Sequence, residues 1–353
     1  MIVEQFLPAL HWGDAIGNST LHFHRFLKSQ GVDSRIVALS IDAALQDIAL
    51  DFNQYSECAD SIKVLHFAVP SVLTDFFISA RGRKVMIYHN VTPPEFFVNF
   101  SPELTRFTRT GRDHLQKLSR TFDLCVADSR YNANELLEIG YECDIRVFPI
   151  MIDPAEYDHL ESSAYRRLLS DERDTIIFVG RVSPNKKIED LIKVLFFYKK
   201  YISPSIRLVV SGKTDTLPGY FYALRDLAGR FYLDAEDILF TGHIPFSELL
   251  AVYRSGDVFL SMSEHEGFCL PLIESCLFKV PVLAYDAGAV AETLDGAGIL
   301  FRQKSVEMVA GMAQRLIGDQ ELRARLKKAA DERMAAYRRQ SNPQRLLEWL
   351  AEK

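Results

Sequence analysis

The chain has 353 residues, of which 48% are hydrophobic and 25% are charged, a composition typical of a globular protein long enough for two domains. A formal net charge of −6, without a basic low-complexity tail, argues against nucleic acid as a partner. Five cysteines without Cys-x-x-Cys spacing favour buried thiols in a reducing compartment, so we expect a cytoplasmic protein.

The first half of the chain alternates strand-like and helix-like segments. It begins without a basic region followed by a long apolar core, and no window reaches the roughly 18 apolar residues of a membrane span, so neither a signal peptide nor a transmembrane helix is expected. The expected segments are 2–7, 17–29, 35–39, 62–68, 72–79, 85–89, 102–118, 124–127 and 132–139. Such alternation predicts a parallel sheet with helices on both faces.

The alternation restarts after a connector that contains Pro149 and Pro154 and continues as a polar stretch to residue 174. The expected segments are 175–179, 188–201, 207–211, 218–227, 238–241, 246–255, 258–261, 270–278, 280–284, 289–294 and 299–301, followed by an almost wholly helical tail from 306. We therefore predict two doubly wound, Rossmann-like α/β domains over residues 1–153 and 154–335, with a terminal helix at 336–353.

The most informative segment runs from Ser263 to Glu274, because it places two glutamates eight positions apart across a turn. A strand-like apolar run precedes it and helical spacing follows from Leu270, so Glu266 is predicted in a strand-to-helix loop and Glu274 on the helix. Backbone N–H groups at a helix N-terminus favour phosphate, and Gly267 lets the main chain approach an anion closely. Carboxylates on either side of a phosphate can accept hydrogen bonds from hydroxyls, although two solvated glutamates would show the same spacing.

With its flanking Ser263, Gly267, Phe268 and Pro271, this segment resembles the signature of the retaining, GT-B fold glycosyltransferases of family 4. That signature is a Glu, seven residues and a second Glu within Ser-x-x-Glu-Gly-Phe-Gly-Leu-Pro-x-x-Glu. Cys269 stands where many members have Gly, which keeps a backbone N–H but makes the phosphate loop less permissive. The resemblance implies a GT-B fold of two domains that face each other across a cleft, with a last helix that returns to the first domain.

The resemblance also implies the roles of these residues. The nucleotide-sugar donor is expected in the second domain and the acceptor in the first. Glu266 is expected to be catalytic and to orient the transferred sugar, while Glu274 holds the ribose. The donor diphosphate is expected against the backbone of the loop residues Gly267, Phe268, Cys269 and Leu270.

Two cations follow the strand predicted at 175–179. Arg181 comes directly after Gly180 and Lys186 lies five residues later, and ligands of open α/β sheets bind beyond the carboxyl ends of the strands. The resemblance assigns both cations to the departing diphosphate, whereas the fragment alone would suit a solvated basic loop. No Asp-x-Asp metal signature ends a strand, so neither a metal nor a cofactor is expected, and fixed cations and amides replace it.

Two further loops are assigned by resemblance. The loop after the strand at 238–241 is expected to border the nucleobase through His243 and Ile244, and the loop after the first strand places Gly13, Asp14 and Gly17 near the donor diphosphate or the acceptor. A helix-terminal acid would explain Asp14 equally well. The two glycines do not form Gly-x-Gly-x-x-Gly and no acid ends the second strand, so a dinucleotide-dependent dehydrogenase is disfavoured.

His89 stands at the end of the strand predicted at 85–89. Family members with a His at this strand end use it near the transferred sugar, so His89 is expected to hydrogen-bond a sugar hydroxyl or to polarise the reacting centre, with a structural His as the alternative. Basic residues gather near the aromatic pair Phe96-Phe97: they are Arg81, Arg83, Lys84, Arg106, Arg109, Arg112, Lys117 and Arg120. They predict either peripheral contact with anionic lipid at the inner face of the membrane or a solvated helix face.

Taken together, the resemblance implies an enzyme that moves a hexose from a nucleotide diphosphate sugar to a hydroxyl of a glycan or lipid-linked acceptor. It would retain the anomeric configuration, by same-face attack, and would need no metal. The Gly-Asp-Ala-Ile-Gly-Asn loop and Tyr-His-Asn-Val-Thr-Pro look most like bacterial surface-polysaccharide transferases of O-antigen, capsule and lipopolysaccharide biosynthesis, many of which use GDP-mannose. A mannosyltransferase is therefore favoured, with a UDP-sugar next. A catalytically idle nucleotide-sugar-binding scaffold and a GT-B sugar-nucleotide epimerase are the alternatives.

Overall fold

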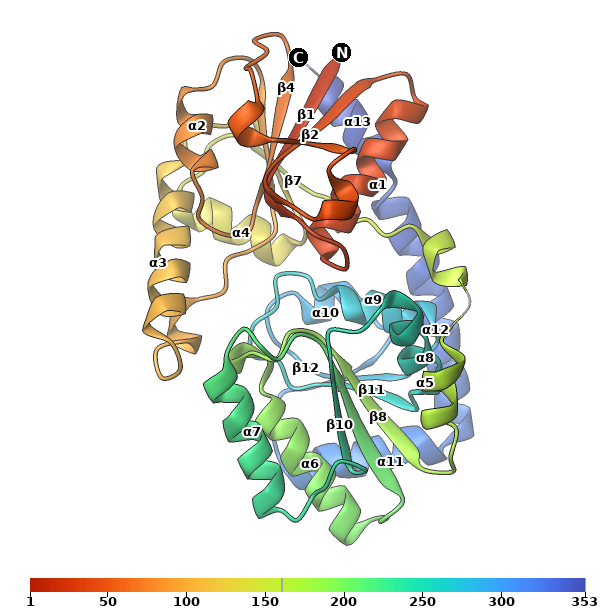
Figure 1. Ribbon diagram of the computed structural model, residues 1–353. Coiled ribbons are helices and arrows are strands. Elements are labelled where there is room, and N and C mark those ends of the chain that lie inside the picture. Colours follow the sequence, from red (N-terminus) through yellow and green to blue (C-terminus); the bar gives the residue numbers. More distant parts are fainter. Residues whose placement is uncertain (160, 353) are drawn as a thin grey trace. The chain divides into compact units, whose positions relative to one another are not determined.

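The computed structural model describes residues 1–159 and 161–352, which form two compact units (Figure 1). The first unit contains Met1–Glu95, Pro102–Asp153 and residues 337–352, and the second contains Phe96–Ser101 and Pro154–Ala336. The short segment Phe96–Ser101 therefore packs with the second unit, although its neighbours in the sequence belong to the first.

The first unit is built on a seven-stranded parallel sheet in the order β3-β2-β1-β4-β5-β6-β7. Its strands are β1 (Ile2–Leu10), β2 (Asp33–Ile41), β3 (Ala49–Asp51), β4 (Ile62–Phe67), β5 (Lys84–Tyr88), β6 (Leu124–Ala127) and β7 (Asp144–Val147), and its helices are α1 (Ala15–Ser29), α2 (Leu73–Ser79), α3 (Pro102–Lys117) and α4 (Arg130–Ile139). Every residue of β6 is buried, as expected for a strand covered on both faces by helices.

The second unit repeats this architecture with a six-stranded parallel sheet in the order β10-β9-β8-β11-β12-β13. The strands are β8 (Asp174–Val179), β9 (Ile206–Ser211), β10 (Ile238–Gly242), β11 (Val258–Ser261), β12 (Val282–Tyr285) and β13 (Ile299–Phe301). The helices are α5 (Ser163–Leu168), α6 (Ile188–Tyr201), α7 (Pro218–Arg230), α8 (Phe246–Ser255), α9 (Leu270–Leu277), α10 (Val290–Leu294), α11 (Val306–Gly318) and the long α12 (Gln320–Gln340).

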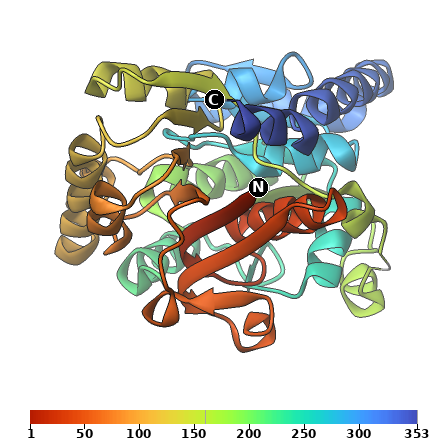
Figure 2. The same cartoon turned by 90° about the horizontal axis from the view of Figure 1, so that it is seen from above.

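The last helix, α13 (Pro343–Ala351), packs against α1 of the first unit (Figure 1 and Figure 2). Leu346 and Leu350 are fully buried there in one core cluster with Phe23 and Leu27 of α1. Arg83 donates to the main-chain carbonyl of Trp349 at 3.0 Å, which fixes the end of the helix. The predicted fold class is therefore confirmed: there are two doubly wound sheets, and the terminal helix returns to the first unit.

The sequence reading missed several short elements. The edge strands β3 and β7 were not expected; β7 is the short, partly polar run Asp144-Ile145-Arg146-Val147, without the continuous apolar character of the inner strands. The segment interpreted as a polar connector to residue 174 also contains a 3₁₀ turn at Pro154–Asp158 and helix α5. The hydroxyl of Ser162 accepts from the N–H of Tyr165 and caps α5, a local signal that the polar composition concealed.

Candidate active site

The strongest candidate site lies at the carboxyl edge of the second sheet, where the strand order reverses between β8 and β11. Doubly wound sheets bind their ligands outside such a switch point, because the loops there diverge to opposite faces. The loop after β8 carries Arg181 and Lys186, and the loop after β11 carries Glu266. Nζ of Lys186 lies 2.7 Å from each carboxylate oxygen of Glu266, and the two side chains are 18% and 6% exposed. Arg181, directly after β8, has an exposed side chain.

The main chain around Glu266 is fixed from two sides. Nδ2 of Asn185 donates to the carbonyl of His265 at 3.2 Å, and the N–H of Ala289 donates to the carbonyl of Glu266 at 2.9 Å. A Cβ on Gly288 would lie only 2.3 Å from that carbonyl, so only glycine allows this approach. Glu266, the catalytic candidate, therefore lies on a loop whose main chain is held by hydrogen bonds on both sides and by the close approach of Gly288.

Helix α9 begins directly after this loop, with Cys269 in the left-handed region at φ +70°. This conformation explains why Gly suits the position, since a side chain there is strained. Burial raises the pKa of the Cys269 thiol well above its usual range, and the neighbouring Glu266 carboxylate, to which the thiol hydrogen-bonds, raises it further. The carbonyl of Phe268 accepts from the hydroxyl of Thr293 at 2.5 Å, which ties the loop to α10.

Glu274 lies on α9 and is buried. Its two carboxylate oxygens accept hydrogen bonds from Tyr157 at 2.7 Å and from Tyr253 at 2.5 Å. Burial raises the pKa of Glu274, while the two phenol donors favour the charged form and oppose that shift. A ribose would have to share these oxygens with the two tyrosines, and the ribose assignment stays a prediction.

The loops after β9 and β10 border the same edge of the sheet. A Cβ on Gly212 would lie 2.0 Å from the carbonyl of Gly180, so the loops after β8 and β9 touch main chain to main chain. His243 follows β10 directly and is exposed, and Ile244 beside it is half-buried. The structure thus places the nucleobase candidates on the same unit and the same sheet edge as Lys186, and their role stays a prediction.

Lys304 was missed by sequence reasoning, because a single Lys in a polar loop carries no signal. Its Nζ donates to the carbonyl of Met262 and to Glu264, each at 2.8 Å, and to Asp190 at 3.3 Å. The ammonium also lies 4.7 Å from the centre of the Tyr285 ring. Lys304 thereby ties the segment that leads to Glu266 to helix α6, which follows Lys186.

In the first unit, the predicted glycine loop forms the start of α1. Asp14 is the N-cap of this helix, and its carboxylate accepts from the N–H of Gly17 at 3.1 Å. Gly13 adopts φ +76°, and a Cβ on Gly17 would lie 3.0 Å from the carbonyl of His11. The structure thus gives Asp14 a capping role, which leaves its predicted contact with donor or acceptor as a prediction.

His89 follows β5, as expected, but its side chain is only 3% exposed. Its Nδ1 lies 2.8 Å from Asp128 and its Nε2 lies 3.0 Å from Nδ1 of His66. Both ring nitrogens therefore already have protein partners. A direct hydrogen bond from the ring to a sugar hydroxyl, as the sequence suggested, would require one of these partners to be displaced.

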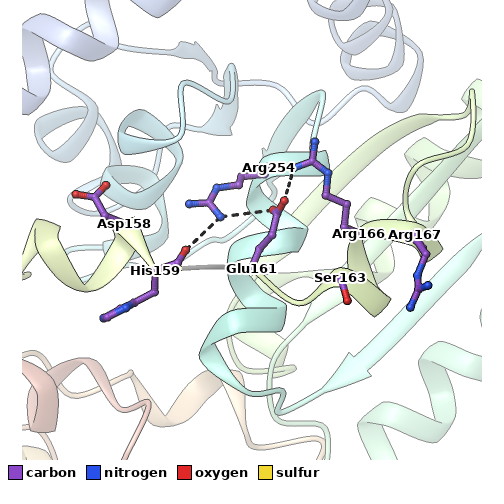
Figure 3. A pocket seen from close by; sticks show the side chains of 7 residues that line it. All are labelled: Asp158, His159, Glu161, Ser163, Arg166, Arg167 and Arg254. Atoms are coloured by element: carbon purple, nitrogen blue, oxygen red, sulfur yellow. Dashed lines mark hydrogen bonds and ion pairs between the residues drawn. The ribbon is translucent and has the colours of Figure 1, made fainter.

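A cavity of ≈ 520 Å³ lies apart from these strand ends, between the segment after Tyr157 and helix α8 (Figure 3). Arg166 and Arg254 both pair with Glu161, and Arg254 also donates to the carbonyls of Tyr157 and His159. Arg254 holds the connector onto α8, and none of the predicted site residues lines the cavity.

Two features that bear on ligands and membranes are absent from residues 1–159 and 161–352. Within these ranges, no three His, Cys, Asp or Glu side chains are grouped so that they could hold a metal ion. None of the helices described there has the length and apolarity required to cross a membrane.

Comparison with known proteins supports the family resemblance for the second unit. Residues 164–333 match the family model described as glycosyl transferases group 1. Sulfoquinovosyl transferase SQD2 of Arabidopsis thaliana is 28% identical over 231 residues, which are 62% of this chain and 42% of that protein. A GDP-mannose-dependent alpha-(1-6)-phosphatidylinositol monomannoside mannosyltransferase of Mycobacterium tuberculosis is 29% identical over 181 residues, or 48% of this chain and 44% of that protein. The chain thus spans less than half the length of these two curated relatives.

Solved structures confirm the GT-B fold over nearly the whole chain. Anabaena Alr3699/HepE, solved in complex with UDP-glucose, covers 99% of this chain, with 98% of its own chain covered, at a TM-score of 0.74 and 17% identity. At that identity the likeness establishes the fold alone.

Proposed function

We propose that this chain, whose residues 164–333 form a domain of the glycosyl transferases group 1 family, moves a hexose from a nucleotide diphosphate sugar to a hydroxyl of a glycan or lipid-linked acceptor. The observation that carries the proposal is the Lys186–Glu266 pair at the switch point of the second sheet, beside the start of α9. A cation, a carboxylate and a helix N-terminus within one loop cluster suit a diphosphate joined to a sugar.

The proposed mechanism begins with an exchange of partners. A diphosphate bound by Arg181 and Lys186 gives Lys186 a second anion, so Glu266 is released to accept hydrogen bonds from the sugar hydroxyls. As the glycosidic bond breaks, negative charge grows on the leaving diphosphate oxygen, where fixed donors stabilise it most, at about 3 kcal/mol for a single group. The backbone of Gly267, Phe268, Cys269 and Leu270 adds N–H groups at the same place.

The remaining roles follow the same division. Glu274 holds the ribose, His243 and Ile244 border the base, and the acceptor lies on the first unit near Gly13 and His89. Attack by the acceptor on the face that the diphosphate leaves retains the anomeric configuration, and the departing phosphate takes up the hydroxyl proton. No metal takes part in this scheme, because Arg181 and Lys186 supply the charge.

GDP-mannose is the first candidate donor and a UDP-sugar the second. The GDP-mannose-dependent relatives support the first, and the UDP-glucose complex of the structurally similar HepE supports the second. The serotype-specific mannosyltransferase WbdA of Escherichia coli, 23% identical over 170 residues, likewise supports a mannosyl donor.

A peripheral position on the cytoplasmic face of a membrane would suit a lipid-linked acceptor. Helix α3 exposes the basic side chains of Arg106, Arg109 and Lys117, together with Phe107, which is 41% exposed. Arg120, just beyond the helix, is also exposed. Arg112 does not belong to that surface, because it donates to Glu135 at 2.5 Å and to the carbonyl of Val91 at 2.9 Å. Sedimentation with vesicles of anionic lipid tests the idea, and binding that is absent or insensitive to salt would exclude it.

The decisive experiment incubates the protein with GDP-mannose or UDP-glucose in excess chelator and follows the products. Slow release of free sugar and nucleoside diphosphate is the result expected of a transferase without its acceptor. Conversion of the donor into its epimer would identify the epimerase alternative, and an unchanged donor would favour the idle scaffold. Turnover that appears only without chelator would overturn the metal-independent scheme.

A further inference from the structure

A row of buried polar side chains crosses the carboxyl edge of the first sheet, from β6 through β5 and β4 to β1. Asp128 follows β6, His89 follows β5, His66 lies near the end of β4 and Gln5 lies in β1. The contacts along the row are 2.8 Å from Asp128 to His89, 3.0 Å from His89 to His66, and 3.2 Å from His66 to Gln5. His66 and Asp128 are each 2% exposed, and Gln5 is fully buried.

The first step concerns the Gln5 amide, whose orientation is set by helix α1. Nε2 of Gln5 donates to the carbonyl of Thr20 at 3.3 Å, so Oε1 is the atom that faces His66. The reverse orientation would set the amide oxygen against that carbonyl, where two acceptors repel each other. Gln5 therefore presents an acceptor to Nε2 of His66.

The second step uses the hydroxyl of Thr20, which lies 3.4 Å from the same His66 nitrogen. This hydroxyl donates its single proton to the carbonyl of Ile16 at 2.8 Å. Towards His66 it can only accept. Both polar neighbours of Nε2 of His66 are thus acceptors, and that nitrogen must carry a proton.

The third step places the next proton. Burial, and then the proximity of His89, hold the pKa of His66 well below its usual range. Among residues 1–159 and 161–352, the ring hydrogen-bonds to Thr20, His89 and Gln5 and to no carboxylate that would stabilise a charge. His66 is therefore neutral with its proton on Nε2, and its Nδ1 is a lone pair. Nε2 of His89 must donate to that lone pair.

The last step is a count of protons. With Nε2 of His89 protonated, the 2.8 Å contact between its Nδ1 and Asp128 still needs a proton of its own. If Asp128 were ionised and His89 neutral, neither group would have a proton for this contact. The pair must therefore hold one proton more than an ionised Asp128 and a neutral His89 hold together. Oδ1 of Asp128 is buried and has no hydrogen-bond partner among the described residues, so His89 is the group that balances this carboxyl.

We infer that His66 is a positioning residue that fixes a proton on Nε2 of His89, and that His89 and Asp128 share one further proton. His89 then has no lone pair to offer and cannot serve as a general base. In the proposed transfer, on which this reading of its role rests, both ring nitrogens of His89 stay engaged with His66 and Asp128, and the acceptor proton must leave by another route.

The test is a measurement of the ring nitrogens by ¹⁵N NMR on the wild-type protein labelled in histidine, at neutral pH. The His66→Gln and His89→Gln variants assign the signals. We expect Nε2 of His89 to be protonated and Nδ1 of His66 to show the strongly downfield position of an unprotonated nitrogen. An unprotonated Nε2 on His89 would overturn the inference.

A pair of variants tests the origin of the pattern. Gln5→Leu removes the main acceptor, so part of His66 should move its proton to Nδ1 and Nε2 of His89 should lose its own. Gln5→Glu places a carboxylate against the ring, which stabilises an imidazolium, so His66 should then carry protons on both nitrogens. A wild-type pattern in both variants would refute the role of Gln5, and if Gln5→Leu fails to fold, the wild-type spectrum still decides. The measurement uses no nucleotide sugar, so its outcome is independent of whether the proposed transfer occurs.

Discussion

The carboxyl edge of the second sheet carries Lys186 and Glu266, which pair with each other and keep 18% and 6% of their side-chain surface exposed. At the same edge of the first sheet, the His89 and Asp128 side chains are 3% and 1% exposed. They belong to the buried row of polar side chains, whose members hydrogen-bond mainly to one another. Lys186 keeps some contact with solvent and can take a ligand anion as a second partner, whereas the sealed row holds its protons and its geometry. The two sheets share one topology, so the difference comes from the side chains placed at the strand ends.

The largest expected effect comes from removing the carboxylate of the Lys186–Glu266 pair. Glu266→Ala should lower turnover of the donor by about 10²–10³-fold, because a group that contacts the sugar in the transition state contributes several kcal/mol. Steady-state kinetics measures this, and Glu236→Ala is the control, since that side chain is 84% exposed and lies outside the site. Full turnover with an unchanged KM in the Glu266 variant would remove this residue from the mechanism.

The second effect concerns Lys304, which braces the segment that leads to Glu266. Lys304→Met should lower the free energy of unfolding by about 2 kcal/mol, because the 18%-exposed ammonium makes charged hydrogen bonds to Glu264 and Asp190 that a thioether cannot replace. The midpoint of urea unfolding should fall accordingly. Lys328→Met is the matched control, since Lys328 is 82% exposed in a weak pair on α12. Equal midpoints for the two variants would show that the brace is energetically unimportant.

The third effect depends on pH. The pKa of Glu274 is raised above its ordinary 4.5 by burial, so the folded state holds this proton more tightly than the unfolded state. Its contribution to stability is therefore full below pH 4.5 and declines as pH rises through the raised pKa. The Gln side chain of Glu274→Gln does not titrate, so the Tm of this variant relative to that of the wild type should increase as pH rises from 4.5. A constant Tm difference across this range would contradict the raised pKa.

The smallest effect is expected at the start of α9. Cys269→Gly relieves the backbone strain of the left-handed conformation, but it also raises the conformational entropy of the unfolded chain. The free energy of unfolding should therefore change by no more than about 1 kcal/mol. Cys269→Val should destabilise more, because a β-branched side chain tolerates φ +70° least. Thermal unfolding of the two variants ranks them, and the reverse order would contradict the left-handed conformation.

Most of the fold could be predicted from the sequence, because inner parallel strands and their covering helices leave strong local patterns. The predicted segments 188–201, 246–255 and 258–261 coincide with α6, α8 and β11. The short edge strands β3 and β7 lack that pattern, since they gain stability from a neighbouring strand and not from continuous burial.

The site was only partly predictable for a different reason. Loops after strands and the Glu266–Glu274 spacing are local features, and the residues they single out do lie at one edge of the second sheet. The tyrosines on Glu274, the brace by Lys304 and the His66–His89 contact join residues that are distant in sequence. No motif encodes such contacts, because they arise only when the strands are placed side by side.

Calorimetric titration with GDP, UDP and ADP in excess chelator tests the donor site at the second sheet most directly, with Arg181→Ala beside the wild type. We expect one nucleotide to bind selectively and its affinity to fall about tenfold or more in the variant, as the loss of a charge-assisted contact predicts. Arg230→Ala, which removes a 75%-exposed arginine from a surface pair on α7, should bind as the wild type does. Absence of binding for all three nucleotides, or equal affinity in Arg181→Ala, would contradict a donor site at this edge.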